Sequence, residues 1–314
     1  DEGELYVGCA GGLDANISMD YKEVEAPADT KAFKMMISGL KGGHSGMDIN
    51  LGRANANKLI ARLLKKAIDE FGARLASIDG GSLRNAIPRE ASAVVTIPLD
   101  KIDAFVSFVK DYTAILKAEF SATEPAMHIE CQETAKPSQV MCEKCQHRLV
   151  NMVYAIPNGV MRMSDSMPDL VETSNNLAIV KVENGKVKIA NLLRSSVNTA
   201  KDALGEKMKA IAELADAQIE LTGAYPGWKP NMDSPILKTA MKVYQDKFGK
   251  TPEIKAIHAG LECGLFGVCY PHWDMISFGP TIRNPHSPDE RVNIESVGKF
   301  WDFLVEILKN IPAK

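Results

Sequence analysis

The sequence predicts an α/β protein in which an α+β segment, built of ferredoxin-like βαββαβ units, is inserted into an α/β domain. A βαββαβ order of strands and helices runs from about residue 31 to residue 131, and a similar αββαβ order covers about 139–221. After the Gly/Pro-rich stretch 223–230, helices and strands alternate instead. A chain of 314 residues is long enough for about two domains.

The first unit contains a long amphipathic helix between its opening strands. Apolar residues recur at three- and four-residue spacing over 51–71, which predicts a helix with one buried face. The other expected elements are strands at 31–40, 74–79, 91–98 and 127–131, and a helix at 100–120 with Asp100 as its N-cap.

The second unit resembles the first without its opening strand. Its two central strands are joined by Asn184–Gly185, a typical tight hairpin turn. The expected elements are helices at 139–154 and 201–215 and strands at 170–182, 187–193 and 217–221.

The C-terminal segment has too few strands to form a sheet by itself. It predicts helices at 235–248, 260–266 and 294–311 and strands at 253–257 and 274–278, with Asp233 or Ser234 capping the first helix. We expect the strand at 5–9 to join this sheet, so that the middle of the chain is an insertion. The remaining strands of the sheet should then precede Asp1, where the chain begins with neither an initiator Met nor a signal peptide.

Composition excludes two classes of partner. The net charge is −3, from 37 Lys and Arg against 40 Asp and Glu, so nucleic acid is not expected to bind. No apolar run approaches the ~20 residues that cross a bilayer, which argues against a membrane role. The six cysteines are too sparse for a disulfide framework and favour a reducing, cytoplasmic compartment.

Two histidines lie in loops suited to chemistry. Three glycines surround His44 between a strand and a helix, which exposes the imidazole at an edge, although a plain turn would have the same pattern. His286 lies between Pro285 and Pro288, which restrict the backbone and favour a zinc ligand. The alternative for this second loop is that it only caps the next helix.

The elbow around Glu262 follows an expected strand and opens a short helix. The carboxylate could bind a substrate ammonium group or could simply cap the helix, where the dipole favours it. His258 and Cys263 also allow a cysteine-nucleophile hypothesis. Cys142 and Cys145 form half of a zinc-knuckle pattern, but no second cysteine pair follows them.

Two further loops contain polar side chains at strand ends. Asn85 lies beside Arg84 between two strands, and Arg194 ends another strand. A guanidinium group suits a substrate carboxylate, although ordinary exposed loops have the same composition.

Taken together, these segments resemble the aminoacyl-histidine dipeptidases, a family of di-zinc metallopeptidases that includes the cytosolic non-specific dipeptidases of bacteria. The matching segments are GELYVGCAGG (3–12), LKGGHSG (40–46), LGRANANK (51–58), GSLRNAIPR (81–89), HAGLE (258–262) and HSPDER (286–291). They occur in order along the whole chain. The resemblance implies a lid domain at 13–224 inserted into a catalytic domain, whose C-terminal part is formed by 1–12 and 225–314.

The resemblance also implies roles for individual residues. His44 corresponds to the catalytic lid histidine that stabilises the oxyanion, and Asn85 and Arg194 correspond to lid residues that bind the substrate carboxylate or the scissile carbonyl. Gly260 and Glu262 correspond to the substrate-binding elbow. The one remaining match is His286, which corresponds to the last zinc ligand. The family's other zinc ligands and its general base have no counterpart in this sequence.

The implied function is the hydrolysis of Xaa-His and other dipeptides by water activated on two zinc ions in the intact enzyme. A short peptide substrate and a homodimer in the cytoplasm follow from the same resemblance. The chain alone is expected to be inactive and to hold little or no metal, since one histidine ligand cannot bind two zinc ions. The alternative is a non-enzymatic ferredoxin-like module for dimerisation or for binding a small molecule.

Overall fold

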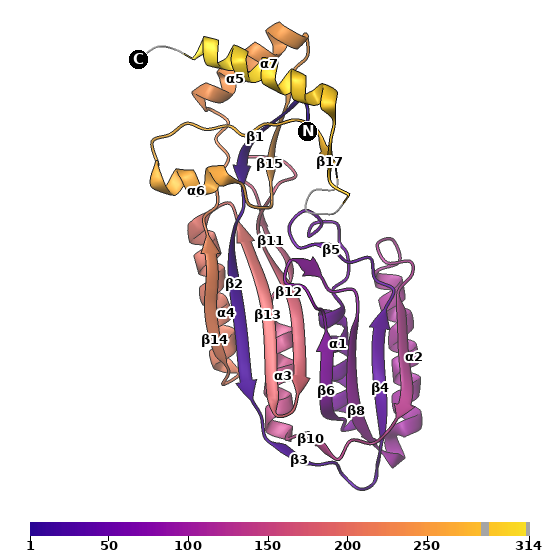
Figure 1. Cartoon of the computed structure of the whole chain (residues 1–314). Helices are drawn as coiled ribbons and strands as arrows, with labels where there is room; N and C mark the ends of the chain where they lie inside the picture. Colours follow the sequence, from indigo (N-terminus) through magenta and orange to yellow (C-terminus); the bar gives the residue numbers. More distant parts are fainter. Residues whose placement is uncertain (284–288, 312–314) are drawn as a thin grey trace.

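A computed structural model describes residues 1–283 and 289–311, and it confirms the mixed α/β class. Residues 11–225 form a nine-stranded sheet, and a smaller two-stranded sheet lies at one end of the molecule (Figure 1). The strand order of the large sheet is β14-β2-β13-β12-β6-β8-β4-β9, with β11 paired to β12, and every pair is antiparallel. Its strands are β2 (Gly11–Asp20), β4 (Thr30–Ser38), β6 (Arg74–Gly80), β8 (Ala91–Pro98), β9 (His128–Thr134), β11 (Gly159–Met163), β12 (Val171–Glu183), β13 (Lys186–Ser195) and β14 (Gln218–Tyr225).

Four helices cover one face of the large sheet (Figure 1). They are α1 (Ala56–Phe71), α2 (Ile102–Glu119), α3 (Glu143–Ala155) and α4 (Asn198–Leu214). Apolar residues of α1, among them Leu59, Leu63 and Leu64, are fully buried in the main hydrophobic core between the helices and the sheet. Asn55 caps α1 by accepting a hydrogen bond from the Lys58 backbone N–H at 3.2 Å.

The large sheet contains two ferredoxin-like units side by side. In the first unit the spatial order is β9-β4-β8-β6, and in the second it is β14-β2-β13-β12, so the same arrangement occurs twice. The opening strand of the second unit is therefore β2, which precedes the whole first unit in the chain. The sequence does not predict β2, because Gly11, Gly12, Asp14 and Asn16 have low strand propensity.

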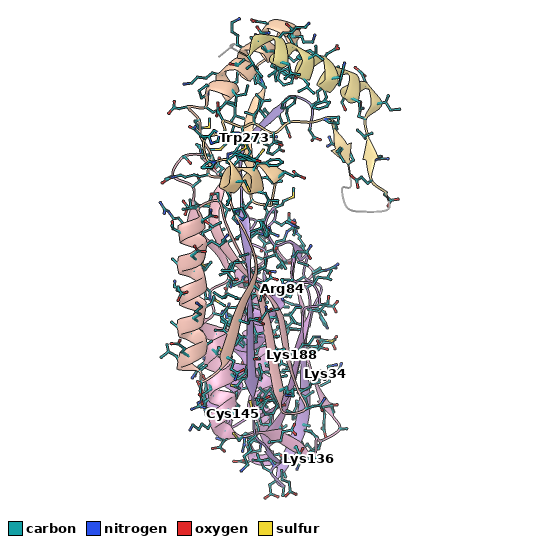
Figure 2. The ribbon with its side chains drawn as sticks, turned by 60° about the vertical axis from the view of Figure 1, so that its left-hand side comes forward. Lys34, Arg84, Lys136, Cys145, Lys188 and Trp273 are labelled. Carbon is teal, nitrogen blue, oxygen red and sulfur yellow. The ribbon has the colours of Figure 1, made fainter. Side chains whose placement is uncertain are left out.

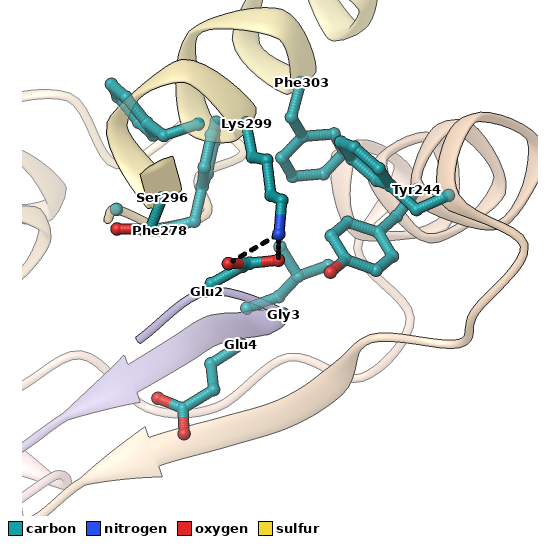
Figure 3. A pocket seen from close by; sticks show the side chains of 12 residues that line it. Glu2, Gly3, Glu4, Tyr244, Phe278, Ser296, Lys299 and Phe303 are labelled. Carbon is teal, nitrogen blue, oxygen red and sulfur yellow. Dashed lines mark hydrogen bonds and ion pairs between the residues drawn. The ribbon is translucent and has the colours of Figure 1, made fainter. Parts of the chain in front are cut away.

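A second, smaller core lies at the other end of the molecule. There β1 (Glu4–Cys9) pairs in parallel with β15 (Glu253–Ile257), which confirms that the first strand of the chain joins the C-terminal segment. Helices α5 (Pro235–Phe248) and α7 (Ile294–Asn310) pack on this pair and bury Leu5, Tyr244 and Phe303. Figure 3 shows the pocket between β1 and α7, where the Lys299 ammonium pairs with the Glu2 carboxylate at 3.0 Å.

The large sheet begins and ends at one place. β1 leads directly into β2, and Gly12 near the start of β2 is paired with Tyr225 at the end of β14 (Figure 1). The chain therefore enters and leaves residues 11–225 through adjacent strands. This is the geometry of an inserted segment, while the boundaries 13–224 stay a prediction.

Several elements differ from their predicted bounds. Residues 274–278 form no strand, and only Ser277 bridges to Tyr6. The segment 139–141 is a short strand, β10 (Gln139–Met141), paired with β3 (Glu23–Glu25) instead of the first turn of a helix. A 3-10 turn, η1 (Leu99–Lys101), contains Asp100, so this residue is not the N-cap of α2. The short remaining elements are β5 (Gly43–His44), β7 (Ala86–Ile87), α6 (Glu262–Cys269), β16 (Ile282–Arg283) and β17 (Arg291–Val292).

Candidate functional site

The His44 loop is held beside Asn85 by a short strand pair. In the β5–β7 pair His44 lies opposite Ala86, and the Ser45 backbone N–H donates to the Asn85 carbonyl oxygen at 2.8 Å. The loop needs glycine at Gly43, where φ is 140° and an added Cβ would lie 2.6 Å from the Asp48 carboxylate. His44 and Asn85, which are far apart in sequence, are therefore neighbours.

The tautomer of His44 follows from its contacts. Its Nδ1 accepts hydrogen bonds from the backbone N–H groups of Gly46 and Met47, both at 3.1 Å. A nitrogen that accepts from N–H donors carries no proton, so the proton of the neutral ring is on Nε2. The half-buried imidazole thus has its donor on the side away from the loop backbone.

Arg194 is a buried cation bound to neutral groups. Only 5% of its surface is exposed. Its Nε and Nη2 donate to Ser45 Oγ at 3.4 and 3.3 Å, and its Nη1 donates to the Tyr225 hydroxyl at 3.1 Å. Within residues 1–283 and 289–311, no carboxylate forms a salt bridge with it. A buried guanidinium group without an ion-pair partner is suited to a carboxylate ligand.

His258 is hydrogen-bonded to strand β12 of the large sheet. Its Nε2 is hydrogen-bonded to Ser174 Oγ at 2.7 Å, and burial lowers the pKa of its imidazole to about 3, with further lowering by the charges of Arg194 and His44. The ring is therefore neutral at ordinary pH. A Cβ added to Gly46 would lie 2.0 Å from the His258 carbonyl oxygen, so the His44 loop packs directly on this residue.

The elbow after β15 is connected to Arg194 through Tyr225. A Cβ added to Gly260 would lie 3.2 Å from the Tyr225 ring, whose hydroxyl accepts from Arg194. His44, Asn85, Arg194 and Gly260 are thus connected through a few shared contacts. Glu262 begins α6 two residues further on and is exposed.

Side chains of the large sheet hold the loop that contains Asn85. The Asn176 side chain donates to the carbonyl oxygens of Arg84 and Ala86 at 3.2 and 2.8 Å. The guanidinium group of Arg84, which is labelled in Figure 2, pairs with Asp14 at 3.2 Å and donates to Asn16 at 2.6 Å. These contacts hold the loop rigidly on the sheet.

Four residues of the site are not predicted by the sequence alone: Ser45, Ser174, Asn176 and Tyr225. A signal for two of them was present, because five consecutive polar residues at 172–176 follow Val171, the first residue of the buried strand β12. Polar side chains inside a buried strand need hydrogen-bond partners, and a polar site beside the strand supplies them. Nothing local distinguishes Ser45 or Tyr225.

The described residues do not fit a dinuclear zinc centre. Across residues 1–283 and 289–311 there is no group of three or more His, Cys, Asp or Glu side chains that could hold a metal ion. A zinc ion in a protein is bound by about four such donors. His286, the predicted zinc ligand, lies outside the described residues.

The geometry argues against the cysteine-nucleophile alternative. His258 is hydrogen-bonded to Ser174, and burial raises the pKa of the Cys263 thiol, with smaller contributions from Cys9 and Glu262. A nucleophilic cysteine needs a lowered pKa instead.

No helix in residues 1–283 and 289–311 is long and apolar enough to cross a bilayer.

Two known proteins match this chain over its whole length. The chain is 45% identical over all 314 residues to the cytosol non-specific dipeptidase of Escherichia coli (strain K12), of which it covers 65%. The crystal structure of aminoacylhistidine dipeptidase from Vibrio alginolyticus matches 100% of the chain with a TM-score of 0.96 and 46% identity, and the chain covers 64% of that protein. Residues 36–124 match the family described as the M20 peptidase dimerisation domain. The chain is therefore similar over its whole length to these dipeptidases, and it spans slightly less than two thirds of their length.

Proposed function

We propose that this chain supplies the lid and the substrate-binding residues of a metal-dependent dipeptidase. The observation that carries the proposal is Arg194, a buried cation that has hydroxyl partners but no described ion pair, in contact with the loop of His44. A dipeptide has a free carboxylate close to its scissile bond. A fixed guanidinium group beside an imidazole donor matches both groups of such a substrate.

The role proposed for each residue combines its position in the structure with the resemblance to dipeptidases. Arg194 binds the C-terminal carboxylate, which restricts substrates to short peptides. The Nε2–H of His44 donates to the oxyanion that develops on the scissile carbonyl, and the Asn85 amide orients the substrate beside it. Gly260, which packs closely on Tyr225, lines the substrate pocket, and the exposed Glu262 carboxylate binds the ammonium group of the substrate.

The metal centre is proposed to lie mostly outside this chain. The described residues contain no cluster of metal ligands, and the dipeptidase relatives are longer than this chain. His286 would be the single ligand contributed from here. Zinc is the metal that the family resemblance implies, and bound zinc lowers the pKa of water toward neutrality.

Partners and location are carried over on the same basis. The match of residues 36–124 to a dimerisation domain supports a homodimer, and a short peptide is the proposed substrate. The printed name of the Escherichia coli relative places that protein in the cytosol, which supports a cytoplasmic location here.

The proposal is tested by steady-state kinetics on a protein that contains this chain and is as long as its dipeptidase relatives. Arg194→Lys should raise KM for a dipeptide about 10- to 100-fold, because hydrogen bonds to charged groups contribute about 1.5–3 kcal/mol. His44→Gln should lower kcat by about 10²–10³, as the loss of one oxyanion donor does. The matched control is Arg148→Lys on α3, where the arginine pairs only with the exposed Asp216 among the described residues.

The outcomes are distinct. Unchanged KM and kcat in both site variants would refute the assignment of these residues. If the enzyme failed to cleave any dipeptide but still bound a small molecule through Arg194, a binding module would be the better description.

A further inference from the structure

Two cysteines lie at the start of α3, where the proposed function assigns no role. Cys142 and Cys145 are free thiols, and both are only partly buried. Figure 2 shows Cys145 toward the end of the molecule marked by Lys136, opposite the end that contains Trp273. Whatever these thiols do, they act apart from the candidate site.

The local structure places the two thiols together. Cys142 is the N-cap of α3 and has an extended backbone, with φ −60° and ψ 149°, while Cys145 is the third helical residue. Side chains three residues apart on a helix are about 5–6 Å apart at Cβ. A disulfide needs Cβ atoms about 3.5–4.5 Å apart, so the N-cap residue must move roughly 1–2 Å toward Cys145 to close one.

The surrounding contacts keep this turn in place. The Cys142 backbone N–H donates to the Lys22 carbonyl oxygen at 2.9 Å, which continues the pairing of β10 with β3. The buried Gln146 side chain accepts from the Leu75 backbone N–H at 3.0 Å and donates to the Ala73 carbonyl oxygen at 3.1 Å. The first turn of α3 is therefore held against β6, and the two thiols stay close together.

The charges differ between the two sulfur atoms. Partial burial of Cys142 opposes its ionisation and by itself would raise the pKa of its thiol. The net pKa is nevertheless lowered, because the thiol interacts with the Cys145 thiol and backbone N–H and with the charges of Arg74 and Lys22. Burial raises the pKa of the Cys145 thiol, and Cys142 raises it further. Arg74 also has a buried Nε without a hydrogen-bond partner in the described part of the chain. The N-terminus of a helix and nearby cations favour a thiolate.

We propose that Cys142 and Cys145 form a redox-active dithiol that exchanges with low-molecular-weight disulfides. The Cys142 thiolate attacks one sulfur of the external disulfide, forms a mixed disulfide and releases one thiolate, which takes up a proton. The Cys145 thiol then loses its proton to solvent, and its sulfur attacks Cys142 Sγ and releases the second thiolate. The protein loses two electrons and two protons overall, and the external disulfide is reduced to two thiols.

Oxidised glutathione is the probe for the test. The reduced 314-residue protein is incubated with it, quenched with acid, unfolded and alkylated, and its peptides are analysed by mass spectrometry. The peptide that contains Cys142 and Cys145 should lose two hydrogen atoms and escape alkylation. Cys142 should react several-fold faster than Cys269, the exposed lone cysteine that serves as the control.

Two variants separate the steps. Cys145→Ser should stop at a stable glutathione adduct on Cys142, and Cys142→Ser should remove the fast reaction. Cys269→Ser should leave both steps unchanged, and circular dichroism checks that each variant is folded. The proposal is overturned if Cys142 reacts no faster than Cys269, or if no disulfide forms between Cys142 and Cys145 at any ratio of oxidised to reduced glutathione.

Discussion

His258 is the residue whose burial has the clearest consequence for pH dependence. Its pKa is about 3 in the folded chain and about 6.5 in the unfolded chain. Between these two pH values the unfolded state binds more protons, so the free energy of unfolding rises with pH. Above about pH 6.5 this contribution is constant, and it is lost as the pH falls toward 3.

We therefore expect wild type to lose stability on acidification more steeply than His258→Gln. The difference should approach about 1.4 kcal/mol per pH unit below pH 6. Urea unfolding at about pH 5 and about pH 7.5 measures it. Other groups that titrate in the same range, Glu4 among them, are common to both proteins and cancel in the comparison. Parallel pH profiles of the two proteins would contradict the prediction.

Gly46 is the residue at which close packing permits no side chain. A Cβ there would lie 2.0 Å from the His258 carbonyl oxygen, and backbone cannot move aside cheaply. Gly46→Ala should lower the free energy of unfolding by about 1–3 kcal/mol. Gly298→Ala is the matched control, since this helical glycine has open space around it and should gain about 0.5–1 kcal/mol. Equal effects in urea unfolding would show that the contact is unimportant.

At the scale of elements, a single carboxylate holds the loop between β4 and α1. Glu124 is 2% exposed, and its two oxygens accept from the backbone N–H groups of Lys41 at 2.8 Å and Ala54 at 2.9 Å. These two residues are the ends of the loop that contains His44. The carboxylate thus fixes the loop at its base, and we infer that it positions the imidazole.

Replacing Glu124 with Gln should loosen this loop without removing any apolar contact. The amide NH2 group cannot accept from a backbone N–H, so one donor is left unpaired, at a cost of about 1–3 kcal/mol. Hydrogen exchange should become faster at the amides of Lys41 and Ala54. In the control Glu133→Gln, an exposed residue paired with Lys31, exchange at these amides should stay at the wild-type rate. Unchanged exchange in the Glu124 variant would refute the clamp.

For the whole molecule, the two hydrophobic cores are very unequal. The main core lies under the large sheet, whereas the core around Leu5, Tyr244 and Phe303 is small and leaves apolar side chains such as Trp301 exposed on α7. The smaller core contains the strands β1 and β15 that lead to the elbow of Gly260.

The 314-residue protein should accordingly hold less than stoichiometric zinc and should not cleave dipeptides. The physical reason is the absence of a metal-ligand cluster among residues 1–283 and 289–311, since zinc needs about four donors. Elemental analysis after dialysis against zinc measures the first expectation, and a dipeptide assay measures the second. The enzyme at the full length of its relatives is the control and should bind zinc and cleave. One zinc ion or more bound per 314-residue chain would contradict the prediction.

Elements specified by neighbouring residues were predicted well from the sequence. The bounds of α5, β8 and β15 agree with prediction to the residue, because capping, alternation and turn signals lie within each segment. The Ser234 cap, which accepts from the Leu237 backbone N–H, is an example. Where pairing with a distant strand decides the conformation, the prediction failed, as at β10 and at residues 274–278.

The sequence by itself determined the fold class, the two ferredoxin-like units and the similarity to dipeptidases, and it predicted the candidate site residues. Only the tertiary structure decided that β2 completes the second unit, that His44 lies beside Asn85, and that Arg194 is buried with hydroxyl partners. The reason is physical. Periodicity and capping depend on residues a few positions apart, whereas burial and strand neighbours depend on segments that meet only when the sheet has formed.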